Sequence, residues 1–208
     1  MTQRQLLAVA LVAWAGYLSV AILTANATVL PIEHGARTVI AVARQPVLDG
    51  PMRAVSLLGE EWGLVPIILL ASGALWTRHR RWAGALPLVM LGTAGLQWLA
   101  KWMADRPRPN LAPLGFPSGH VLSVVVLLGL AAYVLNRARA RRAARGLGVA
   151  AAAILVVLVA VSRLYLEAHW LLDVVGGFLL GLTYLLLLIW TAETLAARAR
   201  APRAVPSA

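Results

Sequence analysis

Long apolar runs separated by short basic clusters are the feature of this 208-residue chain that most limits its fold. Hydrophobic residues make up 61% of the chain and charged residues only 13%, which leaves too few polar side chains to cover a soluble surface. A bilayer core about 30 Å thick takes roughly 20 apolar residues of helix, and shorter runs are tolerated where flanking side chains reach the interface. Six runs qualify, at residues 6–30, 62–76, 82–100, 121–136, 147–161 and 171–192. The sequence therefore predicts an all-α, six-helix integral membrane bundle.

The distribution of charge predicts how this bundle is oriented. If the N-terminus lies inside, the inner segments carry 12 of the 19 Lys and Arg residues, as the positive-inside rule requires. Trp62, Trp98, Trp102 and Trp170 then fall near the outer boundary, where amphipathic rings are enriched. A net charge of +11 could indicate nucleic-acid binding, but the basic residues stand in clusters between apolar runs, so no nucleic-acid partner is predicted.

Three segments outside the six runs also have predicted roles. Residues 32–61 are too polar to cross the membrane, and Gln45-Pro46 and Asp49-Gly50-Pro51 interrupt them, so we expect two short helical pieces along the outer interface. The first run could be a signal peptide ending near residues 25–27, but it is longer than the usual apolar region of roughly 7–15 residues. Residues 1–200 are thus expected to form one membrane domain, and 201–208 a disordered cytoplasmic tail.

Polar residues suited to chemistry fall into three clusters, and the predicted topology places all of them on the outer face. Each cluster stands at the outer end of a predicted span. They are Lys101 with Arg108; Ser118-Gly119-His120; and Arg163 with His169 and Asp173. Three cations, two of them planar guanidinium groups, suit a tetrahedral oxyanion. A helix that begins at Ser118-Gly119 adds backbone N–H groups and the positive end of its dipole, so the clusters together predict a phosphate site.

Two histidines could act on a phosphate bound there. His169 and Asp173 are four residues apart at the start of a helix, so they share one face and the carboxylate can fix the tautomer of the imidazole. An oriented imidazole is a competent nucleophile, and His120, from another helix, can protonate the leaving oxygen. This pattern indicates phosphoryl transfer through a covalent phosphohistidine.

Other chemistries fit the residues less well. The chain has no cysteine, which excludes a disulfide, a thiolate metal site and a cysteine nucleophile. Two histidines and one carboxylate beside three cations make a poor cation site, so no metal or other cofactor is predicted. The basic residues could instead bind lipid headgroups without catalysis. Gly177 and Gly181 could pack helices between chains or within one chain, which leaves the oligomeric state open.

The spacing of the three clusters resembles that of a known family. Lys, six residues, then Arg-Pro; Pro-Ser-Gly-His; and Ser-Arg, five residues, His, three residues, Asp are the signature motifs of the type 2 phosphatidic acid phosphatase superfamily, and all three match without a departure. The resemblance implies a six-helix membrane core with His169 as nucleophile, Asp173 as its partner and His120 as the acid. It implies that phosphate is held by Lys101, Arg108, Ser118, Gly119 and Arg163. Asp105 and Arg106 lie inside the first motif but are not its defining positions, and no role is assigned to them.

The resemblance leaves the substrate open. Membrane members of the family act on phosphatidic acid, phosphatidylglycerol phosphate, undecaprenyl diphosphate or lipid A phosphates, and some transfer phosphate to another lipid. Short connections between the motifs favour a lipid that enters from the outer leaflet, and the alanine- and arginine-rich composition suggests a bacterial inner membrane. We therefore expect undecaprenyl diphosphate as substrate at an outward-facing site. The rival interpretation is a non-catalytic lipid-binding membrane protein, against which the complete set of His120, His169 and Asp173 argues.

Overall fold

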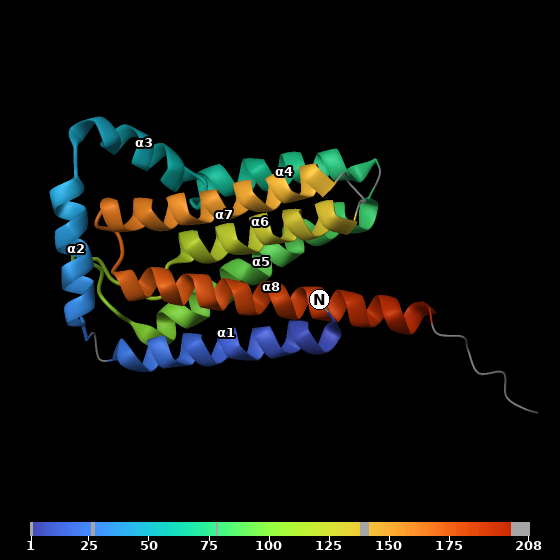
Figure 1. Ribbon diagram of the computed structural model, residues 1–208, viewed down its shortest axis with the longest axis horizontal. Helices are drawn as coiled ribbons and strands as arrows, with labels where there is room; N and C mark the ends of the chain where they lie inside the picture. The colour runs from blue at the N-terminus through green and yellow to red at the C-terminus, as the bar shows by residue number, and fades with distance from the viewer. Residues whose placement is uncertain (1, 26–27, 78, 138–141, 201–208) are drawn as a thin grey trace, which may run out of the picture.

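The computed structural model describes the chain except for residues 1, 26–27, 78, 138–141 and 201–208 (Figure 1). The described residues form eight helices and no strand, which confirms the all-α prediction. The helices are α1 (Gln3–Leu23), α2 (Pro31–Ala43), α3 (Pro46–Leu57), α4 (Glu61–Trp76), α5 (Arg80–Ala104), α6 (Gly119–Arg137), α7 (Arg142–Tyr165) and α8 (Leu171–Arg200). The predicted tail and two of the three residues of the possible cleavage site lie outside the described ranges.

Five of these helices, α1, α5, α6, α7 and α8, are long and apolar enough to cross a membrane. The second predicted span corresponds to α4, which is shorter than these five helices. It has only 16 residues and follows α3 across a break where the two axes bend by 49°. The pair qualifies as a sixth span when it is taken together. Large apolar side chains on the outside of the bundle, such as Val12, Ile22 and Leu70, are more than 70% exposed. Such a surface is suited to lipid rather than water.

The polar segment between the first two spans forms two helices, as predicted. The chain breaks at Arg44-Gln45, and both α2 and α3 begin with a proline, which has no N–H to leave unpaired at that position. Asp49-Gly50-Pro51 does not form a turn and lies inside α3. In Figure 1, α2 runs across one end of the bundle, roughly perpendicular to the long helices, and α3 slopes from it toward α4.

Helix α6 lies at the centre of the bundle. It packs against α5, α7 and α8, while α1 packs along α8 and α4 along α5 (Figure 1). A side chain at Gly177 or Gly181 of α8 would collide with the backbone carbonyl of Ser118 or Leu122. This small-residue pair therefore lets α8 approach α6 closely within one chain, as such pairs do in membrane proteins.

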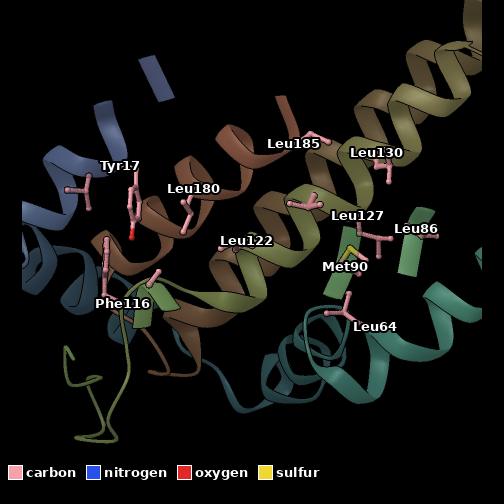
Figure 2. Close-up of a cluster of buried hydrophobic side chains, with 13 residues drawn as sticks. Tyr17, Leu64, Leu86, Met90, Phe116, Leu122, Leu127, Leu130, Leu180 and Leu185 are labelled. Atoms are coloured by element: carbon pink, nitrogen blue, oxygen red, sulfur yellow. The ribbon is translucent and has the colours of Figure 1, made fainter. Parts of the chain in front are cut away.

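A buried cluster extends along this central helix from Phe116 at one end to Leu130 (Figure 2). Leu122 of α6 and Phe116 just before it are fully buried, and Leu180 of α8 and Met90 of α5 belong to the same cluster. Lipid tails are as apolar as these side chains, so the cluster stabilises the bundle through close packing rather than through removal from water. The packing fixes the start of α6 among the ends of α5, α7 and α8.

Candidate active site

The three sequence clusters meet at the end of the bundle that α2 covers. Helix α5 ends there, α6 and α8 begin there, and α7 ends there (Figure 1). A hydrogen bond joins the second cluster to the third, because Ser118 N–H donates to the backbone carbonyl of Asp173 at 2.8 Å. His120 lies within electrostatic reach of His169, Lys101, Arg108 and Arg163. All the residues proposed from the sequence are therefore brought to one place.

Lys101 lies in the last turn of α5, which continues four residues beyond the predicted end of its span. A cation interacts favourably with the helix dipole at this position. The helix ends at Asp105, which adopts a left-handed conformation with φ of 38°. The Lys101 side chain is buried, and its Nζ donates to the carbonyl of Leu114 at 2.5 Å. The loop between α5 and α6 is thereby tied back onto the site.

Ser118 and Gly119 stand at the start of α6, as the sequence predicts. Both are buried. A Cβ at Gly119 would meet the end of the Gln97 side chain of α5, which would have to move aside. The first turn of α6 presents its free N–H groups to the site.

His169 precedes α8 and is 3% exposed, and Asp173 is fully buried. Nδ1 of His169 lies 3.4 Å from Oδ2 of Asp173, a distance that catalytic pairs shorten when substrate binds. The same Oδ2 accepts a hydrogen bond from Trp170 N–H at 2.9 Å. Burial lowers the pKa of His169 to about 4, although Asp173 opposes this effect. His169 is therefore neutral at pH 7, with a lone pair available on the nitrogen that does not face Asp173.

Several buried polar atoms of the site have no hydrogen-bond partner among the described residues. They are Arg108 Nε, Ser118 Oγ, His120 Nε2, Arg163 Nε and His169 Nδ1. Buried polar groups in proteins are normally paired, and the two histidine atoms face carboxylates, so Arg108 Nε, Ser118 Oγ and Arg163 Nε are the donors free for an anion. Within the described ranges, no group of three His, Asp or Glu side chains has the arrangement of a metal site.

Arg106, to which the sequence gave no role, is the centre of a buried ion network. Its guanidinium group is fully buried and donates to both oxygens of Glu33, at 3.2 and 2.7 Å, and to Oδ1 of Asp173 at 2.7 Å. It also donates to the carbonyl of Thr28 at 2.7 Å. Glu33 belongs to α2, so this network anchors the crossing helix to the carboxylate that faces His169. The only sequence signal for this network was Glu33, an acidic residue in a partly apolar segment.

The break between α3 and α4 supplies a further side of the site that no motif marks. Arg163 Nη1 donates to Ser56 Oγ in the last turn of α3, and Ser56 is buried. Glu60 Oε1 lies 3.5 Å from Nε2 of His120, and Gly59 lies against the Cα and Cβ of the same histidine. The bend at this break therefore places Ser56 and Glu60, which belong to no motif, beside the motif residues Arg163 and His120.

Trp170 is more buried than the other three tryptophans that the sequence predicts near the outer boundary. Trp62, Trp98 and Trp102 are at least 66% exposed, in keeping with a membrane boundary, but Trp170 is only 8% exposed. It packs beneath α2, with the guanidinium group of Arg37 5.6 Å from the centre of its ring. The position next to His169 explains the difference, because Trp170 fills the space between α2 and the site.

The fold and the site define the class of this protein as a polytopic α-helical membrane phosphatase. The model of the PAP2 superfamily matches residues 82–196, more than half of the chain. The chain belongs to the PAP2 superfamily, whose phosphatases hydrolyse lipid phosphate esters, and this confirms the family resemblance of the three motifs.

Two curated relatives are phosphatases of lipid phosphates by name. Phosphatidylglycerophosphatase B of Bacillus subtilis (strain 168) is 34% identical over 148 residues, which cover 67% of this chain and 72% of the relative. Lipid phosphate phosphatase delta of Arabidopsis thaliana is 31% identical over 133 residues, which cover 55% of this chain but only 32% of the plant protein. The chain thus resembles the bacterial relative over most of its length and the plant protein over a smaller part.

Two solved structures share the fold. The transmembrane PAP2-type phosphatidylglycerolphosphate phosphatase from Bacillus subtilis superposes with a TM-score of 0.82 at 26% identity, over 89% of this chain and 96% of that one. Aquifex aeolicus LpxE superposes with a TM-score of 0.61 at 21% identity, over 83% and 99%. The first similarity covers 89% of this chain and therefore extends beyond the range that the family model matches.

Proposed function

We propose that this chain hydrolyses the phosphomonoester of a glycerophospholipid at the outer face of a bacterial inner membrane, with phosphatidylglycerol phosphate as its leading substrate. The observation that carries the proposal is the convergence of three cations and two histidines at the end of the bundle, in a chain similar to a phosphatidylglycerophosphatase. Undecaprenyl diphosphate, which the sequence analysis named first, has no specific support from the relatives. It is the alternative substrate that the experiment below tests.

The first half of the proposed reaction uses the neutral His169. Lys101, Arg108 and Arg163 bind the phosphate oxygens, and the start of α6 adds backbone donors. Nε2 of His169 attacks phosphorus, because its Nδ1 faces Asp173. The bond between phosphorus and the glycerol oxygen breaks, and His120 gives a proton to that oxygen. A fixed cluster of cations stabilises the charge that spreads over the transferring phosphoryl group.

The second half releases phosphate. A water molecule gives a proton to the now neutral His120 and attacks phosphorus, the bond between phosphorus and Nε2 breaks, and inorganic phosphate leaves. His120 ends protonated and His169 neutral, so both are ready for another turnover. His120 thus acts as acid in one step and as base in the next, as microscopic reversibility favours for a single group at the leaving position.

Phosphate release from a lipid panel by purified protein in detergent tests the proposal. The panel contains phosphatidylglycerol phosphate, phosphatidic acid and undecaprenyl diphosphate, and His169→Ala is the inactive control. We expect the highest kcat/KM on phosphatidylglycerol phosphate. A higher kcat/KM on undecaprenyl diphosphate would overturn the substrate assignment. Binding of these lipids without any turnover would instead favour the non-catalytic interpretation.

A further inference from the structure

The break between α3 and α4, residues 58–60, contacts the proposed acid directly. A Cβ at Gly59 would lie 2.8 Å from the Cα of His120, so no bulkier residue fits between the break and the first turn of α6. This contact fixes the next residue, Glu60, relative to the imidazole, and its Oε1 lies 3.5 Å from Nε2. Glu60 is partly exposed, while His120 is the more enclosed partner.

The charges around His120 give this carboxylate a specific task. Lys101 of α5, Arg108 of the following loop and Arg163 of α7 all oppose a positive charge on His120, as does His169. Among the described residues, Glu60 is the one carboxylate within ion-pair distance of the ring. Asp173 directs its oxygens to Arg106, Trp170 and His169 instead. A general acid must carry a proton before the reaction, and an adjacent carboxylate stabilises a protonated imidazole.

We infer that Glu60 is the positioning carboxylate of His120, which holds the ring protonated and oriented toward the leaving oxygen. The site then contains two histidine–carboxylate pairs. Asp173 orients the nucleophile His169, and Glu60 orients the acid His120 and stabilises its protonated form. Glu60 takes up no proton in this step, since the proton that leaves His120 goes to the departing oxygen. The inference rests on the proposed role of His120 as general acid.

The effect of Glu60→Gln should depend on the leaving group. Glu61 is the matched control, because it is the adjacent acidic residue, is exposed at the start of α4 and forms no ion pair with the site. On phosphatidylglycerol phosphate, which releases a poor alkoxide, we expect Glu60→Gln to lower kcat about 10- to 100-fold with little change in KM. This is less than the roughly 10²–10⁴-fold value of a complete general acid. On nitrophenyl phosphate the loss should stay below about threefold, and Glu61→Gln should resemble the wild type on both substrates.

Two further variants separate this inference from the proposed function. Glu60→Asp retains a carboxylate and is expected to recover part of the lipid activity that Glu60→Gln loses. In a His120→Ala background, Glu60→Gln should cause no further loss, because it acts through His120. Thermal unfolding in detergent close to the wild-type temperature reports that each variant is folded. A variant that unfolds at a clearly lower temperature is replaced in the comparison by Glu60→Asp.

The outcomes are distinguishable. If His120→Ala loses far more activity on the lipid than on nitrophenyl phosphate, but Glu60→Gln loses the same factor on both, the inference is overturned and the role of His120 stands. If His120→Ala itself loses the same factor on both substrates, the proposed acid is wrong and the inference fails with it. Additive losses in the double variant, or a Glu60→Asp protein no better than Glu60→Gln, would also overturn the role of Glu60.

Discussion

Glu33→Gln is expected to destabilise the protein strongly, although it changes a single atom of a residue outside the motifs. Glu33 is 1% exposed, and each of its two oxygens accepts two hydrogen bonds. Oε1 accepts from Arg106 Nη1 at 3.2 Å and from Leu172 N–H at 3.1 Å. Oε2 accepts from Arg106 Nη2 at 2.7 Å and from Leu30 N–H at 3.0 Å. The carboxylate is therefore surrounded by donors on both sides.

A glutamine cannot satisfy this arrangement in either orientation of its amide. One oxygen replaces one carboxylate oxygen, but the NH₂ group then faces two donors, and flipping the amide only exchanges the two conflicts. Hydrogen bonds to charged groups contribute about 1.5–3 kcal/mol each, and removal of one partner of a buried ion pair costs about 3–5 kcal/mol. We therefore expect the free energy of unfolding to fall by about 3–5 kcal/mol.

Thermal unfolding of the purified protein in detergent measures this effect against Glu167→Gln. Glu167 also pairs with an arginine of α2, Arg37, at 3.0 Å, but both side chains are more than a third exposed. Exposed pairs of this kind contribute about 0–1 kcal/mol, so the control should unfold close to the wild-type temperature. Equal unfolding temperatures for the two variants would refute the buried network as a source of stability.

Three further predictions concern topology, cofactors and pH. A single cysteine in place of the exposed Leu111 should react with an impermeant thiol reagent in intact cells, and one in place of Ala143 should be protected; the reverse pattern would invert the proposed orientation. Activity should persist in EDTA and be inhibited by vanadate, and a loss in EDTA that magnesium restores would refute the metal-free mechanism. Because burial lowers the pKa of His169 from 6.5 to about 4, the unfolded chain binds an extra proton in this range. Stability should therefore fall as pH drops from about 6.5 to 4, and His169→Gln should reduce this fall; an unchanged pH dependence would contradict the assignment.

Hydropathy and motif spacing predicted the bundle and the meeting of the three clusters, because both signals are local. Helix α8 starts at Leu171, as the apolar run predicts, and this puts Asp173 in its first turn below His169. Hydropathy also predicted the bounds of α4 closely, but not that its 16 residues are long enough for a span only together with α3. The bend between them depends on packing against α5 and α7, which the composition of a single segment does not contain.

The residues that the sequence analysis missed share one property: their partners are distant along the chain. Glu33 binds Arg106, 73 residues away, and Ser56 binds Arg163, 107 residues away. No periodicity or spacing rule relates such pairs. Glu60 likewise could only be recognised once the break placed it beside His120. Arg106 lies inside the first motif, but the sequence around an arginine does not show whether its side chain is exposed or buried.

The link between Glu33 and Arg106 also limits how this protein can be recombined with its relatives. The family model begins at residue 82, so Arg106 lies within the matched part and Glu33 before it. A chimera that joins the first 81 residues of one relative to the remainder of another separates two halves of a single buried ion network. Exchange at this boundary leaves a buried charge without its counter-charge wherever the other parent lacks the matching residue. The unit that can be transferred intact is therefore larger than the segment by which the family is recognised.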